Sequence, residues 1–161
     1  MRDRRAEISR VLEEGQERTV TFFETLSPPD LDLPVYVDEV HWTVRRVLAH
    51  FITIETSMQW LFRNMLAGGP GAPEDFDLER FNRTQPAKLD GSSLAELIDR
   101  FRVVRAETIG IVAGMQESDL ERVGRHPFHG TGRLDRFILW ADEHARLHER
   151  DVHNVLEAAG K

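Results

Sequence analysis

Cysteine is absent from the 161 residues of this chain. The absence excludes disulfide bonds, a thiolate zinc site and a cysteine nucleophile, and it fits a reducing cytoplasm. No apolar run approaches the roughly 20 residues that a membrane span needs. The charged opening at residues 1–5 also lacks the apolar stretch of a signal peptide. We therefore expect a cytoplasmic protein without a membrane partner.

The sequence also lacks a concentrated block of basic residues. Lysine and arginine number 21 against 28 aspartates and glutamates, which gives a formal net charge of −7 with both signs mixed along the chain. Because nucleic acids are bound through clustered positive charge, we expect no nucleic-acid partner. Internal repeats and strand-like alternation are missing as well, so the sequence predicts a single all-α domain over residues 1–161.

Apolar residues that recur at three- and four-residue steps predict four long helices. The first spans about residues 3–26, with Gly15 at its middle, where it favours close packing at a cost in helix stability. The second begins near Thr43 and ends at the glycine-rich break at 68–71. The third opens at Ser93 with a capping box, and the fourth follows 130–131. Four such helices predict a four-helix bundle.

The connection between the second and third predicted helices is far longer than neighbouring antiparallel helices need. Such a crossover can travel the length of a helix, which favours a parallel relation between these two helices. The bundle would then run up, down, down, up, and the second and fourth helices would be antiparallel. This topology is the one that we predict.

Three histidines lie on the inward faces of two of these helices. His144 and His148 are four residues apart and share one face of the fourth helix, while His50 flanks the apolar stripe of the second. His50 lies about 10 Å from the start of its helix, and the other two lie about 20–26 Å from the start of theirs. In antiparallel helices a position near the start of one helix lies level with a position near the end of the other, so the three histidines would meet. This favours a divalent metal site with three nitrogen ligands and free coordination positions.

Simpler interpretations compete with the metal site. A lone histidine beside an apolar stripe is more often a hydrogen-bonded core residue, and an HxxxH pair occurs on many surface helices. His126 and His129 could approach the mouth of the pocket, but we favour a solvated loop for both, and we do not count His153 as a ligand. The nearby acid Asp151 could orient an imidazole or accept a proton, but an ion pair is the commoner role. No catalytic base can be named, so the catalytic residues stay unknown.

Four segments of the chain carry a family resemblance. They are the tryptophan, polar cap, apolar run and histidine at 42–50, the aromatic-Asn signature ending at Asn82, the HxxxH at 144–148, and the segment 126–131 before the last helix. With these motifs the sequence resembles the DinB-like (YfiT-like) superfamily over nearly its whole length. One departure is Asp151, where relatives often carry glutamine. Asn82 either bends its loop or contacts a substrate. The tryptophans Trp42, Trp60 and Trp140 are typical of packing or interface residues.

The resemblance implies an up-down-down-up bundle, frequent homodimers, and a divalent metal held by His50, His144 and His148. It also implies activities found in the family, which includes metal-dependent transferases of low-molecular-weight thiols such as bacillithiol or mycothiol, and a mycothiol-dependent maleylpyruvate isomerase. The metal's identity stays open, because histidine suits zinc, nickel, iron and copper, with zinc or nickel preferred here. A thiol would have to arrive as cosubstrate, because the chain has no cysteine.

We therefore hypothesise a metal-dependent enzyme, a thiol S-transferase or a hydrolase, that activates a small thiol or water for attack on a small electrophile. The alternative is a metal- or ligand-binding stress protein without turnover. A sealed, dry metal pocket would favour that alternative, and an accessible cleft would favour an enzyme. A third possibility is a purely structural helical dimer with incidental histidines.

Overall fold

The computed structural model describes residues 2–37 and 41–160. Four long helices dominate it: α1 (Arg4–Glu24), α3 (Val44–Leu66), α5 (Leu94–Ala113) and α6 (Leu134–Ala158). Asp3, Thr43 and Ser93 cap the first three of these helices by accepting hydrogen bonds from backbone amides of the first turn. The predicted caps Thr43 and Ser93 are therefore confirmed. Within the described ranges, no helix is long and apolar enough to cross a membrane.

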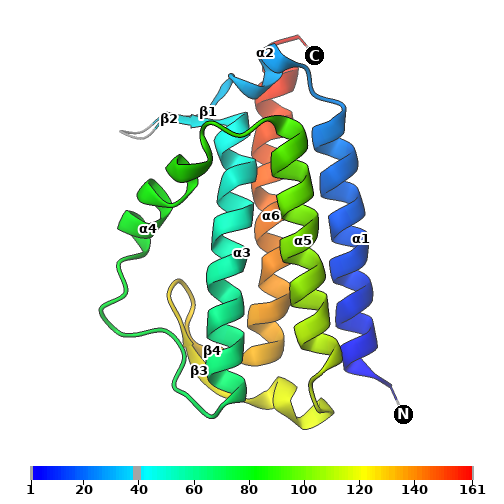
Figure 1. Cartoon of the computed structure of the whole chain (residues 1–161), viewed down its shortest axis with the longest axis vertical. Helices are drawn as coiled ribbons and strands as arrows, with labels where there is room; N and C mark the ends of the chain where they lie inside the picture. The colour runs from blue at the N-terminus through cyan, green and yellow to red at the C-terminus, as the bar shows by residue number, and fades with distance from the viewer. Residues whose placement is uncertain (1, 38–40, 161) are drawn as a thin grey trace.

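The order of the helices is up, down, down, up, as predicted (Figure 1). In that view α1 rises from the N-terminus, α3 and α5 both descend, and α6 rises to the C-terminus. Each helix packs along two others, so that α3 lies between α5 and α6, and α1 lies between the same two helices on the other side. The helices α3 and α6, which carry the three histidines, are consequently antiparallel neighbours.

The connections contain structure that the sequence pattern did not predict. Two antiparallel hairpins are present, one formed by β1 (Pro34–Val37) and β2 (His41–Thr43), the other by β3 (Val123–His126) and β4 (Gly130–Arg133). The expectation of no strands was therefore wrong, because three- and four-residue strands are too short to show a periodic pattern. Short helical turns also occur at α2 (Pro28–Leu31) and η2 (Glu117–Glu121).

The long crossover from α3 to α5 runs beside α3 and contains α4 (Leu78–Thr84) and η1 (Pro86–Leu89) (Figure 1). Its first part is fastened to the second hairpin, because Arg125 N donates to Pro70 O at 2.8 Å and Ala72 N donates to Arg125 O at 2.7 Å. The crossover and the second hairpin are thus held on the same side of the bundle, where both contribute to the site described below.

A layer of buried charge divides the bundle core into two apolar clusters. The guanidinium of Arg105 is fully buried and forms a two-pronged ion pair with Glu55, at 2.9–3.0 Å, while its Nη1 donates to Leu12 O at 3.0 Å. Asp142 of α6 reaches this layer across Gly15 of α1. A Cβ on Gly15 would lie 1.8 Å from Asp142 Oδ1, which explains the glycine and confirms the close packing that was expected there.

Candidate metal centre

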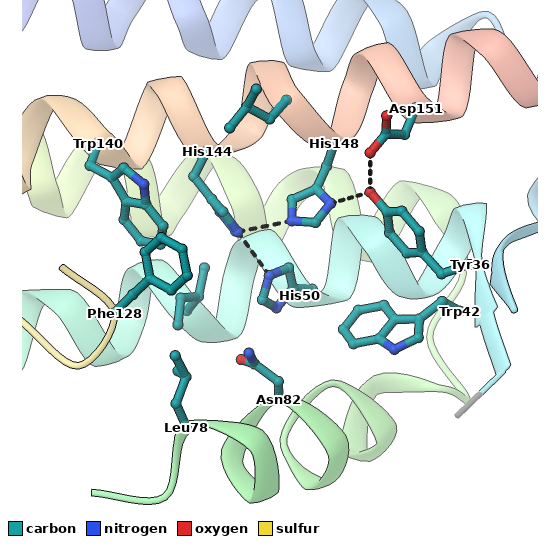
Figure 2. Close-up of a pocket in the computed structure, with 12 residues that line it drawn as sticks. Tyr36, Trp42, His50, Leu78, Asn82, Phe128, Trp140, His144, His148 and Asp151 are labelled. Atoms are coloured by element: carbon teal, nitrogen blue, oxygen red, sulfur yellow. Dashed lines mark hydrogen bonds between the residues drawn. The ribbon is translucent and has the colours of Figure 1, made fainter. Parts of the chain in front are cut away.

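The three predicted histidines meet at one point between α3 and α6 (Figure 2). His144 Nε2 lies 3.0 Å from His50 Nε2 and 3.0 Å from His148 Nε2. All three nitrogens lie within 4.8 Å of one another. His144 and His148 share a face because they are one turn apart on α6, and His50 meets them because α3 is antiparallel to α6. The convergence that the sequence analysis required is therefore present.

The surroundings keep these imidazoles uncharged at neutral pH. His50 is 4% exposed, and its burial, followed by the charge of His148, lowers its pKa to about 3. Burial likewise lowers the pKa of His144 well below the ordinary value, with further contributions from neighbouring histidines. Burial also lowers the pKa of His148, although Asp151 opposes that shift. A neutral imidazole keeps one nitrogen lone pair, which is the form that binds a metal ion.

Hydrogen bonds alone do not account for this arrangement. An imidazole nitrogen carries in its ring plane either one hydrogen or one lone pair. His144 Nε2 can therefore form a good hydrogen bond to only one of its two neighbours at 3.0 Å. A cation placed among the three nitrogens would satisfy all three lone pairs at once. The donor set thus fits a divalent ion that accepts imidazole ligands, such as zinc or nickel.

A tyrosine and an aspartate determine which nitrogen of His148 faces this point. The hydroxyl of Tyr36 donates to Asp151 Oδ2 at 2.5 Å, and its oxygen lies 2.6 Å from His148 Nδ1 (Figure 2). Since the tyrosine hydrogen is used on the aspartate, His148 Nδ1 must carry the hydrogen and donate it to the tyrosine oxygen. His148 Nε2 is then left with its lone pair directed at the other two histidines.

Within residues 2–37 and 41–160, Asp151 does not form the ion pair that the sequence analysis favoured, and it reaches His148 through Tyr36. Burial and the hydrogen bond to Asp151 both raise the pKa of Tyr36, so its hydroxyl keeps its hydrogen. Tyr36 was missed by the sequence analysis because it lies in the short strand β1. The available signal was that it is the single tyrosine of the chain, located among apolar residues just before the second long helix.

A cavity of about 400 Å³ lies directly beside the histidines. Its walls come from β1, β2, α3, α4, the second hairpin and α6 (Figure 2). The lining residues are Tyr36, Trp42, His50, Ile54, Leu78, Asn82, Phe128, Trp140, His144, Leu147, His148 and Asp151. The volume lies within the usual range of small-molecule binding sites.

Two of the three tryptophans lie against the histidines. Trp42 contacts His50 with ring centroids 5.2 Å apart, and Trp140 contacts His144 at 4.5 Å. Both pack against neighbouring rings, as expected, and both also line the cavity. Trp60 lies outside this cavity and is 54% exposed. Asn82 lies in α4 and lines the cavity, which favours the substrate contact over the loop bend.

His126, His129 and His153 stand apart from the three-histidine cluster. His126 was expected in a solvated loop, but it is 2% exposed, and its Nδ1 accepts hydrogen bonds from the backbone amides of Phe128 and His129. It therefore organises the turn of the second hairpin. His129 is exposed, as expected, and contacts Trp140 at 5.0 Å between ring centroids. His153 is exposed and lies 3.2 Å from Glu157, so it is not part of the cluster.

Comparison with protein families gives one match that covers most of the chain. The family model described as the DinB superfamily matches residues 11–152. Comparison with curated protein sequences gives no match.

Solved structures with the same fold were also found. YfiT from Bacillus subtilis, described as a probable metal-dependent hydrolase with an unusual four-helix bundle topology, has 16% identity and a TM-score of 0.78, and the match covers 97% of this chain and 87% of that one. DfsB, described as a sibling lethal factor precursor, has 18% identity and a TM-score of 0.75, with 96% of each chain covered. The colibactin self-resistance protein ClbS, solved in complex with a double-stranded DNA, has 11% identity and a TM-score of 0.72, with 98% and 96% covered. At these identities the three structures establish the shared fold.

Proposed function

The chain belongs to the DinB superfamily, and from this membership and the geometry of the site we propose that it is a metal-dependent enzyme acting on a small electrophilic molecule. His50, His144 and His148 would hold a divalent cation, zinc or nickel in the first place. The observation that carries the proposal is the convergence of three neutral imidazole nitrogens within 4.8 Å beside a cavity of about 400 Å³.

When bound, a divalent ion with three neutral ligands supplies an uncompensated positive charge that lowers the pKa of a water or a thiol. The residues of the chain supply the rest. His148 is oriented by the hydrogen bond that its Nδ1 donates to Tyr36, and Asp151 fixes the tyrosine hydroxyl. Trp42 and Trp140 shield the histidines by covering two of their rings.

The nucleophile is proposed as water or a low-molecular-weight thiol. Water agrees with the description of YfiT as a probable metal-dependent hydrolase, whereas the thiol follows from the resemblance of the motifs to the thiol transferases of the family. A thiol would enter as cosubstrate, since the chain contains no cysteine. We also propose a homodimer and a cytoplasmic location.

The non-catalytic alternative, a protein that only sequesters a metal or ligand, is less well supported. That function favours a sealed pocket, whereas the cavity here has a rim that includes Phe128, 66% exposed, and Leu147, 50% exposed. Access of this kind suits a site that exchanges substrate and product.

The experiment begins with protein purified without a polyhistidine tag. Elemental analysis is expected to find about one divalent ion per chain, and His144→Ala is expected to lose it. The loaded protein is then screened with a panel of small thiols against an electrophile such as monobromobimane, and in parallel with esters and amides without thiol. Thiol-dependent conjugation supports the transferase, and hydrolysis supports the hydrolase. No metal uptake from added zinc or nickel would refute the proposal, and uptake without turnover would favour sequestration.

The structure of ClbS with DNA bears on the expected partners, because it shows that a protein of this fold can bind a duplex. The expectation of no nucleic-acid partner therefore stays a prediction. Its basis is the net charge of −7 and the mixing of charge along the chain.

A further inference from the structure

The cavity beside the histidines has walls that are mostly aromatic. Trp42 enters from β2 and Trp140 from α6, and the ring of Phe128 stacks on that of Trp140 with centroids 6.0 Å apart and an angle of 22° between the planes. Leu78 and Leu147 add aliphatic surface. Flat, apolar walls of this kind are complementary to a planar and largely apolar molecule (Figure 2).

The charge of the walls narrows the class of ligand further. Among the described residues that line the cavity there is no lysine or arginine. The one carboxylate, that of Asp151, already accepts the hydroxyl of Tyr36 at 2.5 Å. An anionic molecule entering the metal-free protein would lose its hydration without gaining a cationic partner, which is costly in an apolar site. Taken without the metal, the walls therefore favour an uncharged molecule.

Asn82 supplies a polar contact that has no partner within the protein. The helix α4 holds it on the cavity wall, and Figure 2 shows its side chain directed towards His50. Its Oδ1 is shielded from solvent and has no hydrogen-bond partner in the described part of the chain. Buried polar atoms of folded proteins are nearly always paired, and an amide oxygen only accepts hydrogen bonds. An N–H or O–H group of a bound molecule would complete this contact.

We infer that the cavity binds small, uncharged aromatic molecules that carry one N–H or O–H donor, with Asn82 as the residue that selects for the donor. This inference concerns the walls of the metal-free cavity. It deepens the proposed function by naming the class of molecule that these walls select, and it rests on that function only for the chemistry that follows binding. Recognition itself depends on Asn82 and the aromatic walls, so it is measurable in protein without metal.

The test uses metal-free protein with Trp60→Phe. The chain has three tryptophans, so this variant leaves Trp42 and Trp140, which both line the cavity, as the fluorescent reporters. Three probes share one ring system: naphthamide has a donor, its N,N-dimethyl derivative has none, and naphthoate is anionic. Naphthamide is expected to change the fluorescence and to bind about tenfold tighter than either of the other two, as expected for one hydrogen bond and for one uncompensated charge.

The matched variants are Asn82→Ala and Asn154→Ala, the second being an exposed asparagine on α6. Asn82→Ala is expected to abolish the preference for naphthamide over its dimethyl derivative, whereas Asn154→Ala keeps it. Equal binding of all three probes, or tightest binding of naphthoate, would overturn the inference. Absence of probe binding would overturn it as well. Because neither metal nor turnover enters this measurement, its outcome is independent of whether the proposed enzymatic function holds.

Discussion

Removing the hydroxyl of Tyr36 is the perturbation that tests the site most directly without touching a proposed ligand. The hydroxyl oxygen lies 2.6 Å from His148 Nδ1 and its hydrogen goes to Asp151 at 2.5 Å. Tyr36→Phe keeps the ring, which contacts those of Trp42 and His148 at 6.3 and 5.6 Å between centroids. The variant therefore removes two hydrogen bonds and leaves most of the packing in place.

The size of the effect follows from what the hydroxyl does. It fixes the hydrogen on His148 Nδ1, and without it the ring is free to place that hydrogen on Nε2, where it would block metal binding. Partners of this kind behind a metal-bound histidine contribute about 10- to 100-fold to affinity. We expect Tyr36→Phe to raise the dissociation constant for zinc by that factor, which corresponds to about 1.4–2.7 kcal/mol. Asp151→Asn should cost less, about threefold, because an asparagine oxygen still accepts the tyrosine hydroxyl.

The assay is a competition titration of metal-free protein against a chromophoric chelator. The absorption spectrum of the cobalt-loaded protein provides a second measurement, which reports ligand geometry. Trp60→Phe and Asp99→Asn serve as controls, because both side chains are exposed and neither lines the cavity. If Tyr36→Phe bound zinc within twofold of the unaltered chain and left the cobalt spectrum unchanged, the orienting role of the hydroxyl would be refuted.

Four further predictions concern stability and partners. Gly15→Ala should destabilise the fold by about 1–3 kcal/mol in urea, because the added Cβ meets a carboxylate of α6 at 1.8 Å, whereas Gly110→Ala, which meets nothing within 4 Å, should stabilise it by about 0.5–1 kcal/mol. Equal changes in the free energy of unfolding for the two variants would contradict the crowding at Gly15. Arg105→Met should cost about 3–5 kcal/mol by leaving the buried carboxylate of Glu55 unpaired, and adding Glu55→Gln should recover part of that loss. Burial lowers the pKa of His126 from 6.5 to about 4, so the stability that depends on its neutral form is present above about pH 6.5 and is lost as the pH falls towards 4. Asparagine at position 126 keeps a hydrogen-bond acceptor but does not titrate. Over that pH interval the free energy of unfolding of the unaltered chain should therefore fall by on the order of 3 kcal/mol more than that of His126→Asn. Parallel pH profiles of the two proteins would contradict this. At about 150 mM salt the chain is expected to leave a DNA duplex unshifted in a gel, and submicromolar binding would refute the expectation that was drawn from its charge.

The features that the sequence predicted are those that long helices encode. Apolar periodicity over twenty or more residues is a strong signal, and it identified α1, α3, α5 and α6. The length of the crossover and the heights of the histidines along their helices then indicated the topology. The convergence of His50 with His144 and His148 followed from that topology, because positions on straight helices are fixed by a constant rise per residue.

The features that the sequence did not predict depend on short elements or on contacts between residues that are distant in the chain. Tyr36 and His126 lie in strands of four residues, where no periodic signal develops, and both turn inward because of the hairpins that hold them. Arg105 lies on an otherwise buried face, where a charge is not expected. Its burial is possible only because Glu55, fifty residues away, forms the two-pronged ion pair. A pattern in one segment cannot contain that information.

The placement of the acidic residues on α6 explains how the site can remain a set of three nitrogens. Asp142, Glu149 and Asp151 all lie close in sequence to the histidine pair, and a free carboxylate there would compete for the cation. Each is held by another partner: Asp142 and Glu149 by Arg18 at 2.9 Å, and Asp151 by Tyr36. Because these three carboxylates are engaged elsewhere, the three imidazoles would be the metal's protein ligands, and its charge would act on a bound water or thiol.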